Sequence, residues 1–111
     1  IETWIEYKMA NEVSAMRQAY IVSYDIADPK RLRKVFRLMR GYGEHVQFSV
    51  FRCEMSPTEM VELRTMLRGV INHAEDQVLF VDVGPVDGRG STSIDAIGKP
   101  YTSPERRAVV V

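Results

Sequence analysis

Two positions in the chain place a helix-capping residue directly before a proline, Asp28-Pro29 and Ser56-Pro57. Serine and aspartate accept hydrogen bonds from the free amides of a first helical turn, and proline is well suited to the first helical position. Glu59 completes a capping box with Ser56. Apolar residues then recur at helical spacing after both signals. The pattern predicts helices over 29–40 and 57–71.

Runs of β-branched and aromatic residues separate the two predicted helices and flank them. Segment 19–26 is typical of a strand buried on both faces, and 78–83 of another buried strand that stops at Gly84. Segment 44–55 fits one long strand or two short ones split near Phe48, and its alternation places Phe48 on the same face as the valines at 46 and 50.

The order strand, helix, strand or strands, helix, strand resembles a ferredoxin-like split βαβ unit. This is an α+β sandwich with one antiparallel sheet and two helices on one face. The apolar run 109–111 has no partner within such a sheet, and an unpaired apolar strand is an aggregation hazard. We therefore expect a two-fold homodimer in which the C-terminal strand is exchanged between subunits.

The chain has 111 residues, enough for one domain. We expect residues 16–111 to form that domain and residues 1–15 to be an extension, native or added. The formal net charge is zero, so only the placement of charges can indicate a nucleic-acid partner. No apolar run approaches the roughly 20 residues of a membrane span. No signal-peptide pattern is visible, and the one cysteine cannot form an internal disulfide, so we expect the cytoplasm.

Asp25 ends the first predicted strand, where a carboxylate is unusual. Near a molecular two-fold axis it would meet its symmetry mate, and two carboxylates repel each other unless a cation joins them. Mg²⁺ is the hard, oxygen-seeking candidate. Alternatively, Asp25 caps a turn by bonding backbone amides ahead of the helix. Both interpretations stay open on the residues alone.

The first predicted helix has no acidic residue between Pro29 and Gly41. Like charges at helical spacing destabilise an isolated helix, which favours a face that meets something anionic, such as a phosphate backbone. A solvated face, neutralised by glutamates elsewhere, is the alternative. The residues that share this face are Lys30, Arg33, Lys34 and Arg37.

The remaining reactive side chains favour structural roles. Cys53 lies in an apolar run and is interpreted as a buried thiol. His45 is more typical of a structural or exposed position than of a catalytic one. His73, at a helix end, is expected to interact with the helix dipole or the last carbonyl groups.

Three segments together resemble one family. They are the strand 20–25 with Ile26 behind it, the stretch 42–51, and the capped second helix. The family is Cas2, the small CRISPR-associated endonuclease and second of the two universal CRISPR adaptation proteins. The similarity covers about 16–83. This chain has His45 where arginine is common and Phe48 where tyrosine is common.

The resemblance implies a ferredoxin-like fold with a hairpin break near Phe48. It also implies a homodimer whose C-terminal strands extend the partner's sheet. The activity implied is that of a magnesium-dependent nuclease cleaving phosphodiester bonds of RNA or DNA, in which Asp25 of each subunit holds Mg²⁺. Arg31, Arg33 and Phe51 occupy positions that resemble residues tied to activity in some members.

Two other functions remain open. The resemblance also implies a structural subunit of the spacer-integration complex, placed between copies of the larger CRISPR integrase subunit (Cas-one) and binding duplex DNA without cutting it. A toxin family shares a related fold, so a toxin-like ribonuclease is a third possibility.

Overall fold

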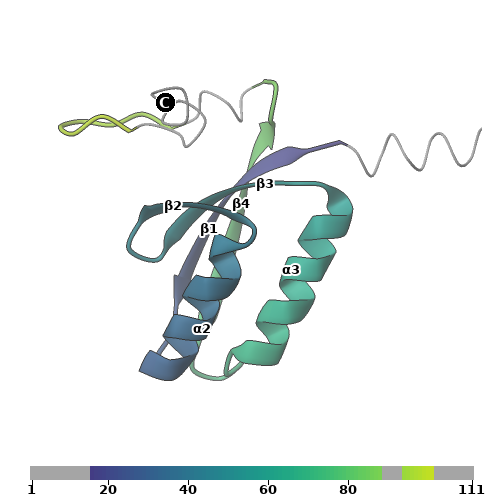
Figure 1. The fold of residues 1–111 in the computed structure, drawn as a ribbon, viewed down its shortest axis with the longest axis vertical. Coiled ribbons are helices and arrows are strands. Elements are labelled where there is room, and N and C mark those ends of the chain that lie inside the picture. Colours follow the sequence, from purple (N-terminus) through teal and green to yellow (C-terminus); the bar gives the residue numbers. More distant parts are fainter. Residues whose placement is uncertain (1–15, 89–93, 102–111) are drawn as a thin grey trace, which may run out of the picture.

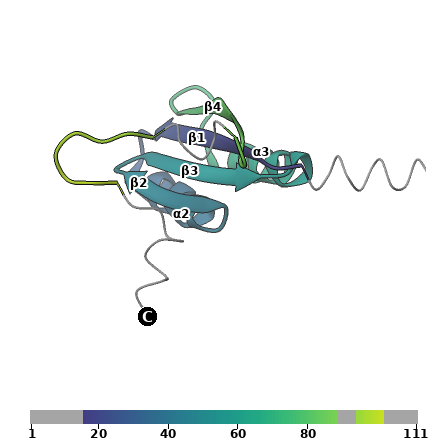
Figure 2. The same cartoon turned by 90° about the horizontal axis from the view of Figure 1, so that it is seen from above.

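The computed structural model describes residues 16–88 and 94–101. Figure 1 shows the two helices side by side, and in the view from above (Figure 2) the strands lie over both of them, so both helices are on one side of the sheet. The helices begin at the two prolines, as predicted. The elements in chain order are β1 (Gln18–Asp25), α2 (Pro29–Arg40), β2 (Gly43–Gln47), β3 (Val50–Met55), α3 (Pro57–Val70) and β4 (Gln77–Pro85).

Local hydrogen bonds explain where the helices start. The Asp28 side chain accepts from the amide of Arg31 at the start of α2. Ser56 and Glu59 form both hydrogen bonds of the capping box at the start of α3. Both caps predicted from the sequence are confirmed.

The four strands form one sheet in the order β2-β3-β1-β4, and every neighbouring pair is antiparallel. Seen from above in Figure 2, the strands follow one another in this order. This arrangement confirms the α+β class with a four-stranded antiparallel sheet and two helices. The predicted exchange of strand 109–111 and the predicted extension 1–15 lie outside the described residues.

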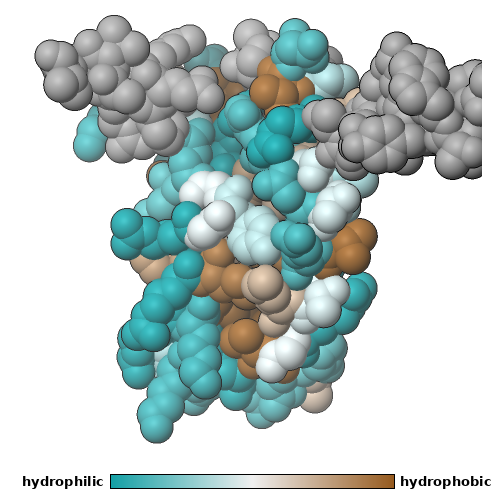
Figure 3. Space-filling model, turned by 45° about the vertical axis from the view of Figure 1, so that its right-hand side comes forward, coloured by the Kyte–Doolittle hydropathy of each residue, from teal (hydrophilic) through white to brown (hydrophobic). Residues whose placement is uncertain are grey.

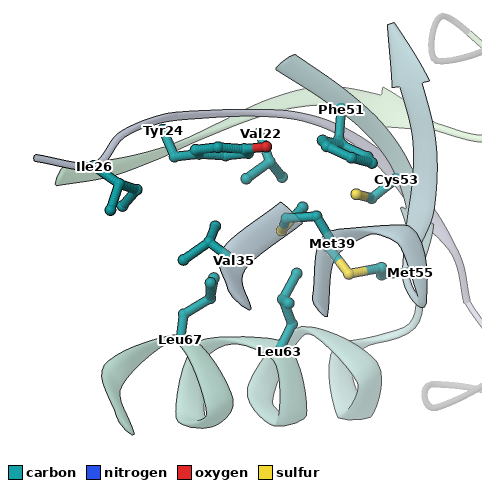
Figure 4. Packing of buried hydrophobic residues seen from close by; sticks show 10 residues of the cluster. All are labelled: Val22, Tyr24, Ile26, Val35, Met39, Phe51, Cys53, Met55, Leu63 and Leu67. Carbon is teal, nitrogen blue, oxygen red and sulfur yellow. The ribbon is translucent and has the colours of Figure 1, made fainter. Parts of the chain in front are cut away.

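The core fills the space between the sheet and the helices, and Figure 4 shows side chains from both layers meeting there. In β3, alternate residues are buried while those between them are partly exposed, as expected from the period of a strand. The cluster consists of Val22, Tyr24, Ile26, Val35, Met39, Phe51, Cys53, Met55, Leu63 and Leu67.

Segment 44–55 forms two strands, which is one of the two alternatives left open and the hairpin break that the resemblance implies. Three other expectations are corrected. Phe48 lies in the turn between these strands at φ 32°, with 92% of its surface exposed. It therefore does not share a face with its neighbouring valines, because the turn takes its side chain out of the alternation. β4 continues through Gly84 (φ 105°) to Pro85, and the strand pairing shifts register at this end. Finally, β1 is not buried on both faces: Val22 and Tyr24 face the helices, whereas Ile21, Ser23 and Asp25 between and beyond them are partly or fully exposed.

Candidate functional site

Asp25 ends β1 on the sheet face that the helices do not cover. Tyr24 points into the core, so the alternation of a strand turns Asp25 to the opposite side. Its side chain is exposed and forms no hydrogen bond or ion pair with any described residue. A carboxylate in this setting is available to an external ligand.

The same face carries hydrophobic side chains. Leu79 and Val81 of β4 lie opposite Ser23 and Ile21 of β1, two and four positions before Asp25. They are 50% and 52% exposed. Hydrophobic residues at this level of exposure, side by side on a sheet, are typical of a surface that a partner covers.

The alternative interpretation of Asp25, as a cap for the turn ahead of α2, is not what the structure shows. Two other aspartates perform that function. Asp28 caps the helix, and the amide of Arg31 holds the pKa of Asp28 below its usual range. Asp76, from the loop before β4, accepts a hydrogen bond from the amide of Ala27 at 2.9 Å.

Arg31 forms the central ion pair of this loop region. Its Nε donates to Oδ2 of Asp76 at 2.7 Å, and its Nη2 donates to Oδ1 of Asp76 and to Glu75, both at 3.2 Å. The amide of Asn72 also donates to Asp76, whose side chain is 0% exposed. The hydrogen bond from Arg31, together with those two backbone amides, lowers the pKa of Asp76 well below its usual range.

The predicted basic residues of α2 are exposed, and none pairs with an acidic group among the described residues. Arg31, by contrast, is partly buried in its ion pair with Asp76. The sequence therefore placed Arg31 and Arg33 together, but the structure gives their guanidinium groups different surroundings. The exposed and unpaired set is Lys30, Arg33, Lys34 and Arg37.

Phe51 is fully buried, with 0% of its surface exposed. Its ring lies 6.2 Å from that of Tyr24, 5.6 Å from that of Phe36 and 5.1 Å from that of His45. It cannot contact a substrate in this conformation. Any effect of Phe51 on a reaction must act through its packing against Tyr24, the neighbour of Asp25 in β1.

A single chain offers little for a metal ion. Within the described parts of the chain, no three residues of the types His, Cys, Asp and Glu gather to form a metal site. Asp25 nevertheless supplies the hard oxygen donor that Mg²⁺ prefers. It fits one ligand of a site that would need a second carboxylate from another copy.

The sequence interpretation missed a cavity beside α2. It has a volume of about 560 Å³ and lies between this helix and the turn that joins β2 to β3. Arg33 and Arg37 line it together with Phe48 at the tip of the turn. The available signal was an aromatic residue between polar neighbours at a possible hairpin, but alternation assigned it to a strand face.

The remaining reactive residues have structural roles. His73 donates to the carbonyl of Arg68 in the last turn of α3 at 2.9 Å, which confirms its predicted interaction with the helix end. His45 is exposed and bonds the carbonyl of Phe48 at 2.6 Å. Burial raises the pKa of the Cys53 thiol to about 12, so this side chain is no nucleophile.

Hydrophilic residues cover most of the side of the molecule shown in Figure 3, around a narrower hydrophobic strip. No helix within the described ranges is long and apolar enough to cross a membrane.

Comparison with known proteins gives a consistent family match. The family model described as CRISPR associated protein Cas2 matches residues 18–87. A Rhodospirillum rubrum protein named CRISPR-associated endoribonuclease Cas2 1 is 38% identical over 103 residues, which is 93% of this chain and all of that protein. A Geobacter sulfurreducens protein named CRISPR-associated endoribonuclease Cas2 is 38% identical over 96 residues, 86% of this chain and all of that protein.

Solved structures agree. Streptococcus pyogenes Cas2 at pH 6.5 superposes with a TM-score of 0.64 at 32% identity, covering 72% of this chain and 99% of that one. A hypothetical protein from Thermus thermophilus gives a TM-score of 0.66 at 30% identity, covering 78% of this chain and 98% of that one. The resemblance read from the sequence motifs is confirmed.

Proposed function

Because the chain belongs to the Cas2 family of CRISPR-associated proteins, we propose that it is a Mg²⁺-dependent endonuclease that cleaves phosphodiester bonds of RNA or DNA as a homodimer. The two relatives described above carry the name endoribonuclease. The observation that carries the proposal is the carboxylate of Asp25, which is exposed on the sheet face that the helices leave open and pairs with none of the described residues.

A second copy of the chain completes this site. Leu79 and Val81 offer a hydrophobic area beside Asp25, and covering it removes apolar surface from water. A two-fold arrangement on this face brings the Asp25 side chains of both subunits to a shared region. Two carboxylates there are compatible only when a cation or a proton relieves their repulsion.

Asp25 is the residue that would hold Mg²⁺. The ion, when bound, would lower the pKa of a water molecule and neutralise negative charge on the phosphate. One carboxylate from each chain makes a sparse site, so we expect weak metal binding and slow turnover.

The basic residues of α2 would hold the nucleic-acid backbone. Arg33 is exposed and unpaired among the described residues, so its guanidinium is free to bind phosphate. Arg31 is committed to Asp76, and we assign it the role of positioning the loop that follows Asp25. Phe51 supports the same end of β1 from within the core. The residues assigned to phosphate binding are Lys30, Arg33, Lys34 and Arg37.

A second function has support from the same helix. The exposed basic face of α2 would suit a scaffold that holds duplex DNA in the spacer-integration complex, with the larger CRISPR integrase subunit as its partner. Such binding needs no catalysis and is compatible with the nuclease proposal.

The nuclease proposal is tested by Asp25→Asn. The substitution removes the metal-binding charge and disturbs no hydrogen bond of the described structure, so folding and dimerisation are expected to survive. Cleavage of end-labelled RNA and DNA in Mg²⁺ should fall at least roughly a hundredfold, and EDTA should abolish the wild-type reaction. Asp87→Asn, at another exposed aspartate, is the matched control and should cleave normally.

Full cleavage by Asp25→Asn would contradict the catalytic assignment. Spacer acquisition in cells that carry the same variant then separates the two functions. Acquisition that persists without cleavage supports the scaffold as the biological role. Acquisition lost by a folded, dimeric variant that still joins the complex contradicts a scaffold-only role.

A further inference from the structure

The cavity beside α2 lies on the helix side of the sheet, away from Asp25. Tyr24 contributes to its wall, whereas the next residue, Asp25, points to the other face. Its volume of about 560 Å³ is within the range of small-ligand sites. The lining residues are Tyr24, Leu32, Arg33, Phe36, Arg37, Arg40, Phe48 and Ser49.

The solvent-exposed ring of Phe48 forms one wall of the cavity. Phe48 is 92% exposed and has a positive φ, which a bulky residue rarely adopts. His45 bonds its carbonyl group, so the turn that presents the ring is fixed at its base. Backbone strain and an exposed phenyl ring both cost stability, and such features cluster at binding sites.

The rim of the cavity is cationic. Arg33, Arg37 and Arg40 line it without any acidic residue, and none of the three forms an ion pair within the described structure. The guanidinium of Arg40 lies 5.8 Å from the centre of the Phe36 ring. A ligand that pairs with the arginines and also stacks on the Phe48 ring must carry negative charge and have a flat face.

We propose that this cavity binds a single unpaired nucleotide of a nucleic acid. Its base stacks on the Phe48 ring, and its phosphates pair with Arg33 and Arg37. A base inside a duplex has both faces covered by the neighbouring stacked pairs and cannot stack on Phe48, so the cavity favours single-stranded segments over the interior of a duplex. The inference rests on the proposed nucleic-acid function and adds to its phosphate-binding arginines a base-stacking contact with Phe48, on the face of the sheet opposite Asp25.

Fluorescence anisotropy with a short labelled single strand and with the blunt duplex of the same length tests the inference. EDTA is present throughout, so binding is measured without cleavage. Phe48→Ala should weaken single-strand binding roughly tenfold and leave duplex binding within about twofold. Phe48→Tyr should bind like the wild type, because its ring can still stack. Val61→Ala, at an exposed hydrophobic residue on α3, is the matched control and should change neither.

The arginines give a second test. Arg33→Gln and Arg37→Gln, each made singly, should weaken the binding of both the single strand and the duplex. Arg68→Gln on α3, which removes the same single charge, should change neither. Unchanged single-strand binding by Phe48→Ala, or an equal loss for strand and duplex, overturns the inference and leaves the nuclease proposal intact. Failure of the wild type to bind either ligand contradicts the proposed function as well. If Phe48→Ala changes the oligomeric state of the protein but leaves oligonucleotide binding unaltered, the cavity contacts another protein chain, and the inference is also overturned.

Discussion

At the residue scale, the buried carboxylate of Asp76 joins two loops of the described structure. Its carboxylate accepts hydrogen bonds from Arg31 and from the amides of Ala27 and Asn72. It thereby fastens the loop before α2 to the loop before β4. Because Gln77 pairs with Asp25 across the two strands, this ion pair also fixes the position of the proposed metal ligand.

Asp76→Asn should lower the melting temperature at pH 7 by about 5–10 °C, since it removes the charge of the buried partner of Arg31 and leaves the guanidinium only its exposed partner, Glu75. The folded-state pKa of Asp76 is lowered, so its stabilisation is fully present above the ordinary carboxyl pKa of about 3.9 and is lost as the pH falls below it. Thermal melts from pH 7 downward should therefore show the difference between wild type and variant shrinking below about pH 4.

Asp87→Asn is the control, at an exposed carboxylate that has no such contacts with the described residues. A difference between wild type and Asp76→Asn that stays constant as the pH falls would show that the charge of Asp76 contributes nothing to stability.

At the element scale, β2 depends on a close approach that only glycine permits. A Cβ atom on Gly43 would lie 2.5 Å from both the Arg52 carbonyl oxygen and the Cys53 sulfur atom. Gly43 pairs with Cys53 at the start of the strand. The β2–β3 hairpin, whose turn carries Phe48, therefore needs a glycine at the end opposite that turn.

Gly43→Ala should reduce the free energy of unfolding by about 1–3 kcal/mol through overpacking, as measured by urea denaturation. Gly69→Ala is the matched control. It lies in α3 with no atom within 4 Å of an added methyl group, and should gain about 0.5–1 kcal/mol from its better helix propensity. Equal effects of the two substitutions would contradict this account of the hairpin.

The same elements show how far sequence reasoning reaches. Asp28 and Ser56 act on amides a few residues away, so both helix starts were predictable from local pattern. The partnership of Arg31 with Asp76 joins residues 45 positions apart, and only the fold brings them together. Phe48 was misplaced because the alternation of apolar residues passes straight through the turn. Asp25 was found because a carboxylate ends a core strand, but only the three-dimensional structure shows that it bonds none of the described residues.

At the scale of the whole molecule, one sheet face is covered by helices and the other is not. The uncovered face combines the hydrophobic side chains of Leu79 and Val81 with the carboxylate of Asp25. A homodimer through this face links the proposed dimer to the proposed metal site. Burial of the hydrophobic side chains drives the association, and the two-fold symmetry brings a second Asp25 carboxylate to the site.

Leu79→Asp should weaken dimerisation at least roughly a hundredfold, since it places an unpaired charge in an apolar contact. Sedimentation velocity over a range of concentrations measures the effect. Val61→Asp, at an exposed residue of α3, should leave the dimer unchanged. A Leu79→Asp protein that remains dimeric would place the interface elsewhere and remove the basis for a shared metal site.

The buried thiol at the centre of the core has a practical consequence. Cys53 is the only cysteine of the 111 residues, and its side chain is inaccessible and protonated in the folded chain. A thiol-reactive label can attach only when the sheet and helices separate. The rate of labelling under non-denaturing conditions therefore reports how often the whole domain opens. A ligand that stabilises the folded state should slow this labelling, so its binding can be followed without an engineered probe.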